Sequence, residues 1–312
     1  MPLPATVYGY RMNRGSSRTR WIVAGAAVLA IAALLVWVVR AVSARGELAK
    51  SVQAFTQAKT MHASAELTVQ FPPLSSGRER PFTELYVRVE GDAERAARTN
   101  APQLANAPQL GGTLHMESRG RGNVFFADGD VRLLSDATLF RLETLPVLLN
   151  PSGSLIKKWT IVSAPVLQTN NASAIQNALS GVFQRLSYTG RESVDGASAL
   201  HFSGHLNAED EEKAAAALAQ NASGNRALNI VARLLRGSDI KSLDVWVAPR
   251  GHEIQRVQIV FVRPGSSREF ATLKLSFTDY GKKVSIDRPR VQTSVNPAVF
   301  AHLFGTGEIH AQ

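Results

Sequence analysis

The sequence of 312 residues contains no cysteine. This absence excludes disulfides, thiolate metal sites, thiol nucleophiles and the acylated cysteine that anchors bacterial lipoproteins. Charged residues are also few, at 19%, while hydrophobic residues make up 45% of the chain. These values argue against a largely disordered chain and against a many-pass membrane protein. The length allows one large domain or two small ones.

Motifs that carry chemistry are missing as well. The chain has no HExxH and no GxSxG motif, and Gly305–Gly307 lacks the lysine and the helix of a phosphate-binding loop. His201 and His205 lie in a strand-and-turn pattern, which places them about 13 Å apart, too far to share a metal ion. The acidic run Glu209–Glu212 fits the solvated first turn of a helix. We therefore expect a protein that is not an enzyme, with no catalytic residue, no metal and no cofactor.

The net charge of +10 is concentrated near the N-terminus, where residues 1–50 carry seven basic side chains and one acidic side chain. The rest of the chain is only mildly basic, which does not support nucleic-acid binding. Between Arg20 and Arg40, the segment Trp21–Val39 has nineteen residues without a charged side chain. As a helix it is about 28 Å long, close to the roughly 30 Å of a bilayer's hydrocarbon core.

This segment predicts a single transmembrane helix that follows a basic cytoplasmic tail, residues 1–20, and leaves the bulk of the chain outside the cell membrane. A cleaved signal peptide is the alternative, because Val42-Ser43-Ala44 resembles a small-residue cleavage site. The apolar stretch exceeds the about 7–15 residues of a signal peptide's core, and Arg40 precedes the possible cut. Both features favour a retained anchor.

After the anchor, residues 40–60 predict a juxtamembrane linker with a short helix, because Leu48, Val52 and Phe55 recur at helical spacing. The period then changes to two, which is typical of half-buried strands. We expect strands in the segments SAELTVQF, ELYVRVE, TLHMES, NVFFAD, DVRLLSD, TLFRLE, KKWTIVS, SYTGRESV and ASALHFSG, and a three-stranded meander in residues 243–277. Asp128-Gly129-Asp130 and Val194-Asp195-Gly196 predict hairpin turns.

Other segments show no strand pattern. Ala93–Gly112 is rich in Ala, Pro, Asn and Gly and predicts an irregular surface excursion. Apolar residues at steps of three and four predict helices over residues 173–186, from Asn207 onward, and over 225–237. The tail after Pro289 has no clear period, and we expect residues 291–312 to be loosely held.

Several segments together resemble LolA/LppX/LprG-like envelope lipoproteins over roughly residues 60–290. The resemblance is carried above all by TGRESVDGASALHFSG, Thr189–Gly204, and by DYGKKVSIDRP, Asp279–Pro289. It implies an α+β domain, residues 61–290, in which a curved antiparallel half-barrel carries helices over its concave face around an apolar cavity for acyl chains. The chain departs from this group because it has a predicted spanning helix instead of a lipidated cysteine, which does not suit shuttling between two membranes.

The candidate ligand is thus a lipid or an acylated lipoprotein, bound without catalysis. An apolar loop and two predicted helices supply the candidate cavity lining, which consists of Leu145, Leu148, Leu149, Leu179, Phe183, Val231 and Leu234. The same residues at the same spacing also suit an ordinary core. The alternative function is therefore a structural or interaction module of the cell envelope, with a filled core and no ligand.

Overall fold

The computed structural model describes residues 47–71, 83–95, 108–120, 125–134, 137–144, 156–162, 186–205, 238–263 and 265–295, together with Glu209, Glu211, Glu212 and Ala216. The predicted anchor Trp21–Val39 and the predicted helices over 173–186 and 225–237 lie outside these residues. In the helix expected from Asn207, the four described residues are helical.

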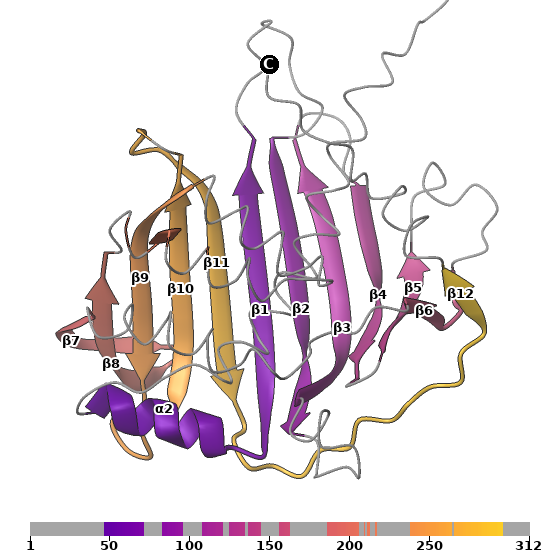
Figure 1. Ribbon diagram of the computed structural model, residues 1–312, viewed down its shortest axis with the longest axis horizontal. Coiled ribbons are helices and arrows are strands. Elements are labelled where there is room, and N and C mark those ends of the chain that lie inside the picture. The colour runs from indigo at the N-terminus through magenta and orange to yellow at the C-terminus, as the bar shows by residue number, and fades with distance from the viewer. Residues whose placement is uncertain are drawn as a thin grey trace, which may run out of the picture.

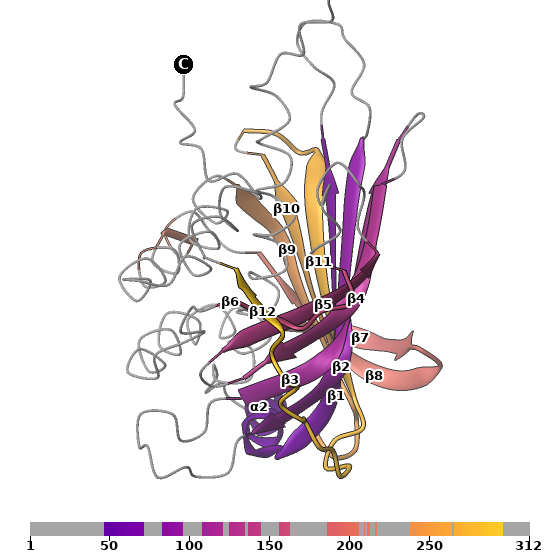
Figure 2. The same ribbon diagram turned by 90° about the vertical axis from the view of Figure 1, so that its right-hand side faces the viewer.

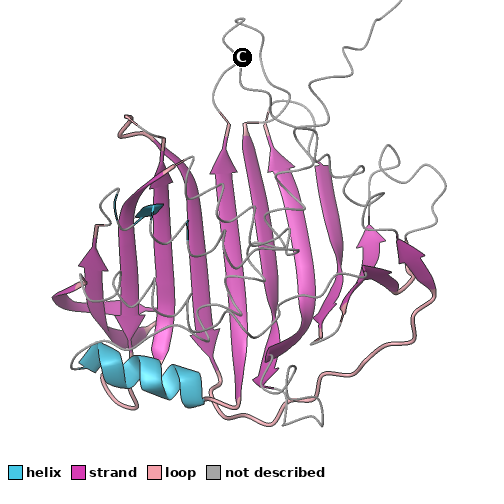
Figure 3. Cartoon of the chain, in the orientation of Figure 1, coloured by secondary structure: helices cyan, strands magenta, loops and turns pink. Residues whose placement is uncertain are grey.

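The described part of the chain is mostly β, with one 12-stranded sheet in the order β12-β6-β5-β4-β3-β2-β1-β11-β10-β9-β8-β7 (Figures 1 and 3). All neighbours pair antiparallel except β12 and β6, which are parallel. The strands are β1 Thr60–Gln70, β2 Glu84–Arg95, β3 Pro108–Arg119, β4 Phe125–Leu133, β5 Thr138–Thr144, β6 Thr160–Val162, β7 Ser187–Val194, β8 Ala197–Gly204, β9 Asp239–Val247, β10 Ile254–Val262, β11 Glu269–Thr278 and β12 Thr293–Val295. This arrangement confirms the predicted curved antiparallel sheet.

The sheet is open and curved, and Figure 2 shows it from the side. Strands β5, β6 and β12 curl toward the face on which α2, Glu47–Gln57, lies, whereas the β7–β8 hairpin projects to the other side (Figure 2). We call the α2 side the concave face and the opposite side the convex face. The hairpin turn predicted at Asp195-Gly196 is present, with φ of 50° at Asp195.

A close approach of two strands helps the sheet to bend. Gly91 of β2 pairs with Gly112 of β3, and a Cβ atom on Gly91 would lie 2.3 Å from the carbonyl oxygen of Gly111. Only glycine fits such a contact. This close approach involves residues inside the segment Ala93–Gly112 and next to it. The prediction that this whole segment is irregular is wrong at its ends, because β2 continues to Arg95 and β3 begins at Pro108.

The predicted hairpin at Asp128-Gly129-Asp130 is also wrong, because these residues lie inside the single strand β4. Gly129 serves a different purpose there. A Cβ atom at this position would meet the carbonyl oxygen of Arg141 in β5 at 2.4 Å, and the register of β4 and β5 shifts between Asp128 and Gly129. Glycine in a strand marks a bulge or a close backbone approach as readily as a turn.

The C-terminal segment is held more firmly than its sequence predicts. Residues Asp279–Gln292, which we call the strap, run from the end of β11 along the α2 end of the sheet and then rise along the edge of the sheet to β12 (Figure 1). The expectation of a loosely held tail is wrong for Thr293–Val295, which form β12 beside β6. A short parallel pair of this kind leaves no periodic signal in the sequence.

Candidate functional site: the concave face of the sheet

The concave face is apolar across its central strands. Alternate residues of β1 point toward it, and they pair with apolar residues on both sides, as Leu67 does with Val87 of β2 and Leu273 of β11. The same alternation continues through β3 and β4 on one side and through β10 and β9 on the other. One buried cluster contains these residues and includes Leu48 and Phe55 of α2. The sheet therefore presents one continuous apolar surface.

The helix α2 covers one end of this surface. Phe55 is fully buried and lies edge-to-face against Phe277 of β11, with 4.8 Å between the ring centroids. Tyr280 packs on the other side of Phe55 and donates its hydroxyl hydrogen to the carbonyl oxygen of Ile254, at 2.6 Å. Burial raises the pKa of Tyr280 well above its ordinary value, so this donor stays protonated. These contacts make a packed floor at the α2 end.

In β1, β10 and β11 the small exposed fraction of the concave-face residues rises with distance from α2, whereas Val87 of β2, beside Leu67, stays at 0%. In β1 the exposed fraction increases from 0% at Ala65 to 9% at Val69, and in β11 it increases from 0% at Leu275 to 8% at Ala271. Ile259 of β10 follows the same trend, with 9% against 1% at Val257. In these three strands the concave-face residues far from α2 are thus slightly more exposed than those beside it, although all of them are buried. We call Leu67, Val69, Ile259 and Ala271 the open end of the concave face.

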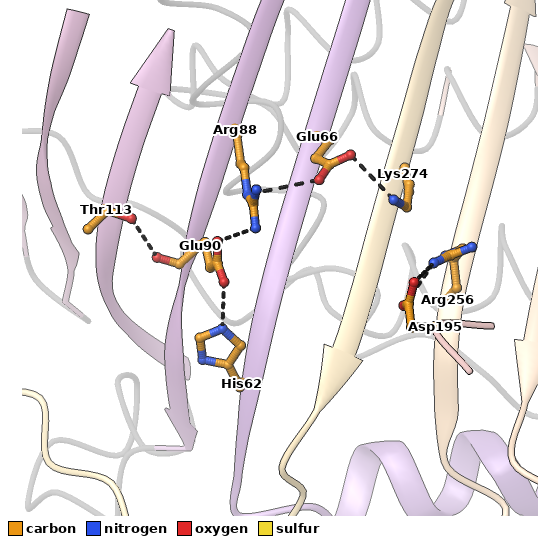
Figure 4. Close-up of polar contacts among 8 residues, drawn as sticks. All are labelled: His62, Glu66, Arg88, Glu90, Thr113, Asp195, Arg256 and Lys274. Carbon is orange, nitrogen blue, oxygen red and sulfur yellow. Dashed lines mark hydrogen bonds and ion pairs between the residues drawn. The ribbon is translucent and has the colours of Figure 1, made fainter. Parts of the chain in front are cut away.

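The convex face has the opposite character. Figure 4 shows a row of charged side chains on β11, β1 and β2, in which Lys274 of β11 pairs with Glu66 of β1 at 3.4 Å and Arg88 of β2 lies between Glu66 and Glu90. His62 contacts Glu90 at 3.2 Å and Asp92 at 2.9 Å. Cross-strand pairs of opposite charge suit a solvated face. An acyl chain has no place on this side, which leaves the concave face as the candidate site.

A second polar group lies at the β7–β8 end. The ring nitrogens of His201 contact the carboxylates of Glu192, at 2.9 Å, and Asp244, at 3.1 Å. The imidazole stacks on Trp246, whose indole N–H donates to Glu192. The indole hydrogen bond is the main cause that lowers the pKa of Glu192. Both ring nitrogens of His201, both oxygens of Glu192 and the indole N–H of Trp246 are thus engaged with one another or with Asp244, which ties β7, β8 and β9 together.

The described residues contain no group of three or more His, Asp or Glu side chains that could hold a metal ion. The expectation of a solvated acidic run fails at Glu211, which is buried and accepts the backbone N–H of Ile240 at 2.6 Å. Burial is the main cause that raises the pKa of this carboxyl above its ordinary value, while the Ile240 hydrogen bond opposes the shift. Glu211 thus ties a helical residue to the start of β9.

The seven residues predicted from sequence to line the cavity, Leu145, Leu148, Leu149, Leu179, Phe183, Val231 and Leu234, all lie outside the described residues, and their role stays a prediction. Sequence reasoning placed Leu67, Val69, Ile259 and Ala271 in strands but did not single them out as a site. The period-two pattern marks them as inward-facing, and only the position of α2 separates them from the packed floor. Within the described part of the chain, no helix has the length and apolar character to cross a membrane.

No protein-family model matches the sequence, and no curated protein matches it. Among solved structures, the chain is similar to the lipoprotein LppX of Mycobacterium tuberculosis, at 16% identity over 77% of this chain and 96% of that chain, with a TM-score of 0.37. It is similar to LprF of Mycobacterium bovis, at 15% identity, 78% and 95% coverage and a TM-score of 0.40. A putative outer membrane lipoprotein-sorting protein domain of Vibrio parahaemolyticus follows, at 7% identity, 76% and 93% coverage and a TM-score of 0.21. These likenesses concern the fold alone.

Proposed function

We propose that the protein is a single-pass membrane protein whose extracytoplasmic domain binds the acyl chain of a lipid or of an acylated lipoprotein on the concave face of its sheet, without catalysis. Trp21–Val39 is the anchor in this proposal. The cavity is lined by the open end of the concave face together with the seven residues predicted from sequence. A lipid or lipoprotein is also the cargo that the sequence resemblance implies.

The observation that carries the proposal is the contrast between the two faces of the sheet. The convex face satisfies its charges in ion pairs, whereas the concave face is apolar over at least seven neighbouring strands, from β4 to β9. Ligand sites for apolar molecules are concave and mostly apolar, with few polar groups. The rise of the exposed fraction along β1, β10 and β11 indicates where an acyl chain would enter, which is the open end of the concave face, because an apolar ligand has to enter where the surface is less tightly packed.

A photoactivatable fatty acid tests the proposal. The full chain is reconstituted in lipid nanodiscs, exposed to the probe and irradiated, and the crosslinked peptides are mapped by mass spectrometry. We expect crosslinks in the peptides that hold Val69 and Ala271, in addition to those from Trp21–Val39, which contact the bilayer and report that the probe is active.

Two variants of adjacent residues in β1 provide a matched pair. Val69→Glu places a carboxylate on the concave face and should remove the crosslinks there, while Thr68→Glu places the same charge on the convex face and should leave them unchanged. Crosslinks confined to Trp21–Val39 in the unmodified chain would contradict ligand binding. They would favour the alternative, a structural or interaction module with a filled core.

A further inference from the structure

The strap is fixed to the sheet at three places. At its start, the N–H of Gly281 donates to the carbonyl oxygen of Thr60, at 2.9 Å, and the hydroxyl of Thr60 donates to the carbonyl oxygen of Lys282, at 2.6 Å. In its middle, Ile286 packs beside Leu134, Ala137 and Leu139 and comes close to Gly111 of β3. The strap is therefore a built part of the domain.

At its far end, the strap is tied to the residue before β6. The N–H of Gln292 donates to the carbonyl oxygen of Trp159, at 2.9 Å, and the side-chain oxygen of Gln292 accepts the N–H of Trp159, at 3.1 Å. Between these fixed points the strap has little secondary structure of its own. Its backbone thus holds a fixed course past the ends of several strands while most of its side chains stay at the surface.

Those side chains are unusually basic for this domain. Four basic residues, Lys282, Lys283, Arg288 and Arg290, are exposed on the strap, against two acidic residues, Asp279 and Asp287. Lys282 pairs with Asp279 at 2.6 Å, whereas Lys283 and Arg290 form no ion pair with any described residue. The four cations therefore exceed what the strap's own carboxylates neutralise.

An apolar side chain accompanies the charge. Val291 follows Arg290 directly and is 37% exposed, one of three exposed large hydrophobic residues in the described part of the chain. Basic side chains beside an exposed apolar residue are the combination with which peripheral segments contact the headgroup region of a bilayer.

The position of the strap brings it close to the predicted anchor. The first part of the strap lies at the same end of the sheet as α2, and the strap then rises along the edge of the sheet to β12 (Figure 1). Lys59, between α2 and β1, is exposed beside the strap's attachment at Thr60. Seven residues, 40–46, separate Val39 from the start of α2. At roughly 3.3–3.6 Å per residue they reach at most about 25 Å. The α2 end of the sheet must then lie near the membrane surface.

We infer that the strap is a docking surface for the anionic phospholipid headgroups of the membrane that holds Trp21–Val39. This inference rests on the membrane anchor of the proposed function. It assigns the basic residues to lipid phosphates and orients the domain, with the α2 end toward the bilayer and the open end of the concave face away from it. The attraction is electrostatic, so it requires anionic lipid and weakens as salt is added.

The absence of cysteine allows a direct test in the full chain. Ser285→Cys puts a single label site on the exposed part of the strap, and Ser267→Cys puts one in the exposed β10–β11 connection. Ser267 lies at the end of β10 and β11 that is opposite the start of the strap, and these strands are roughly 30 Å long at about 3.4 Å per residue. Each variant is labelled with a fluorophore and reconstituted in nanodiscs that contain a headgroup quencher, with or without phosphatidylglycerol in phosphatidylcholine.

We expect the label at 285 to be quenched in the anionic nanodiscs and the label at 267 to remain unquenched. Each basic side chain near an anionic surface changes the binding constant by about fivefold. The double variant Lys283→Glu/Arg290→Glu should therefore lose most of the quenching at 285. The matched reversal Arg263→Glu/Arg268→Glu, at the other end of the sheet, should leave it unchanged.

Quenching at 285 that is equal in neutral and anionic nanodiscs, or that survives the strap reversal, would overturn the inference. Quenching at 267 in place of 285 would show that the opposite end faces the bilayer and would overturn it as well. A chain that does not incorporate into nanodiscs at all would refute the anchor itself, a separate result that flotation on a density gradient reveals before any label is read.

Discussion

Replacing Ala271 with leucine distinguishes a ligand-binding sheet from a filled core. Ala271 belongs to the open end of the concave face and is 8% exposed, with Val69 and Phe261 as its cross-strand neighbours. Ala65 lies on the same face, in the floor beside α2, and is 0% exposed. The variants Ala271→Leu and Ala65→Leu therefore add the same three carbon atoms to two differently packed places.

The expected free energies differ in sign. Forcing extra methylene groups into a filled core destabilises it by about 1–3 kcal/mol, and we expect this loss of unfolding free energy for Ala65→Leu under either function. If the open end is empty without its ligand, the added carbons of Ala271→Leu bury apolar surface at about 0.8 kcal/mol each, so stability is unchanged or rises by up to about 2 kcal/mol. The same carbons occupy ligand space and should lower lipid binding.

Urea denaturation of the delipidated full chain, followed by tryptophan fluorescence, measures both free energies. Delipidation matters because a ligand that binds only the folded state raises the apparent stability. Lipid binding is measured in parallel with the photoactivatable fatty acid. A loss of 1 kcal/mol or more for Ala271→Leu, as in Ala65→Leu, would refute the open end and support the filled core.

Three further results are expected. Phe55→Ala removes the aromatic contact that holds α2 on the sheet, and should lower the free energy of unfolding by about 3–5 kcal/mol in urea denaturation; a loss below about 1 kcal/mol would show that α2 does not close the floor. Burial of His62 opposes its protonation, but Asp92 and Glu90 outweigh it and raise its pKa above 6.5. The stabilisation from this group is then complete below pH 6.5 and disappears as the pH rises through the raised value, so the stability difference between the wild type and His62→Gln should shrink between about pH 6 and about pH 9. An unchanged difference would contradict the ion pairs of His62. Because the pKa of Glu211 is raised, the folded state favours the protonated carboxyl. The contribution of this group to the free energy of unfolding is therefore complete below pH 4.5 and is lost as the pH rises through the raised value. Glu211→Gln, whose amide oxygen can still accept from Ile240, should match the wild type near pH 4 and be more stable near pH 7.5; the reverse order would show that the carboxylate is stabilised.

Most of the sheet could be predicted from the sequence because alternation reports burial directly. In β1 and β11 every second residue packs on the concave face, and residues between them, such as Glu66 and Lys274, form ion pairs on the convex face. The errors fall where another cause outweighs the local pattern. Gly129 looked like a turn residue, but a carbonyl oxygen 2.4 Å from its absent Cβ explains it instead.

The candidate site was harder to predict because its residues do not differ chemically from the core. Leu67 and Leu275 share a face, a period and a residue type, yet their exposed fractions are 8% and 0%. The difference depends on where α2 lies, which is a long-range fact absent from the local sequence. The strap was missed for a similar reason, since hydrogen bonds to Thr60 and Trp159 fix it and such contacts leave no periodic signal.

The size of α2 limits how much of the concave face this helix can cover. An α-helix with its side chains is about 10–12 Å wide, whereas the eleven residues of β1 span about 37 Å. Because α2 is joined to β1 at Lys59 and lies across the strand ends (Figure 1), its Phe55 packs on Phe277 at that end of the sheet. No other helix of the described residues covers the rest of the face. The function therefore depends on what occupies the space above Leu67, Val69 and Ala271, and those positions are where a bound acyl chain and a filled core predict opposite results.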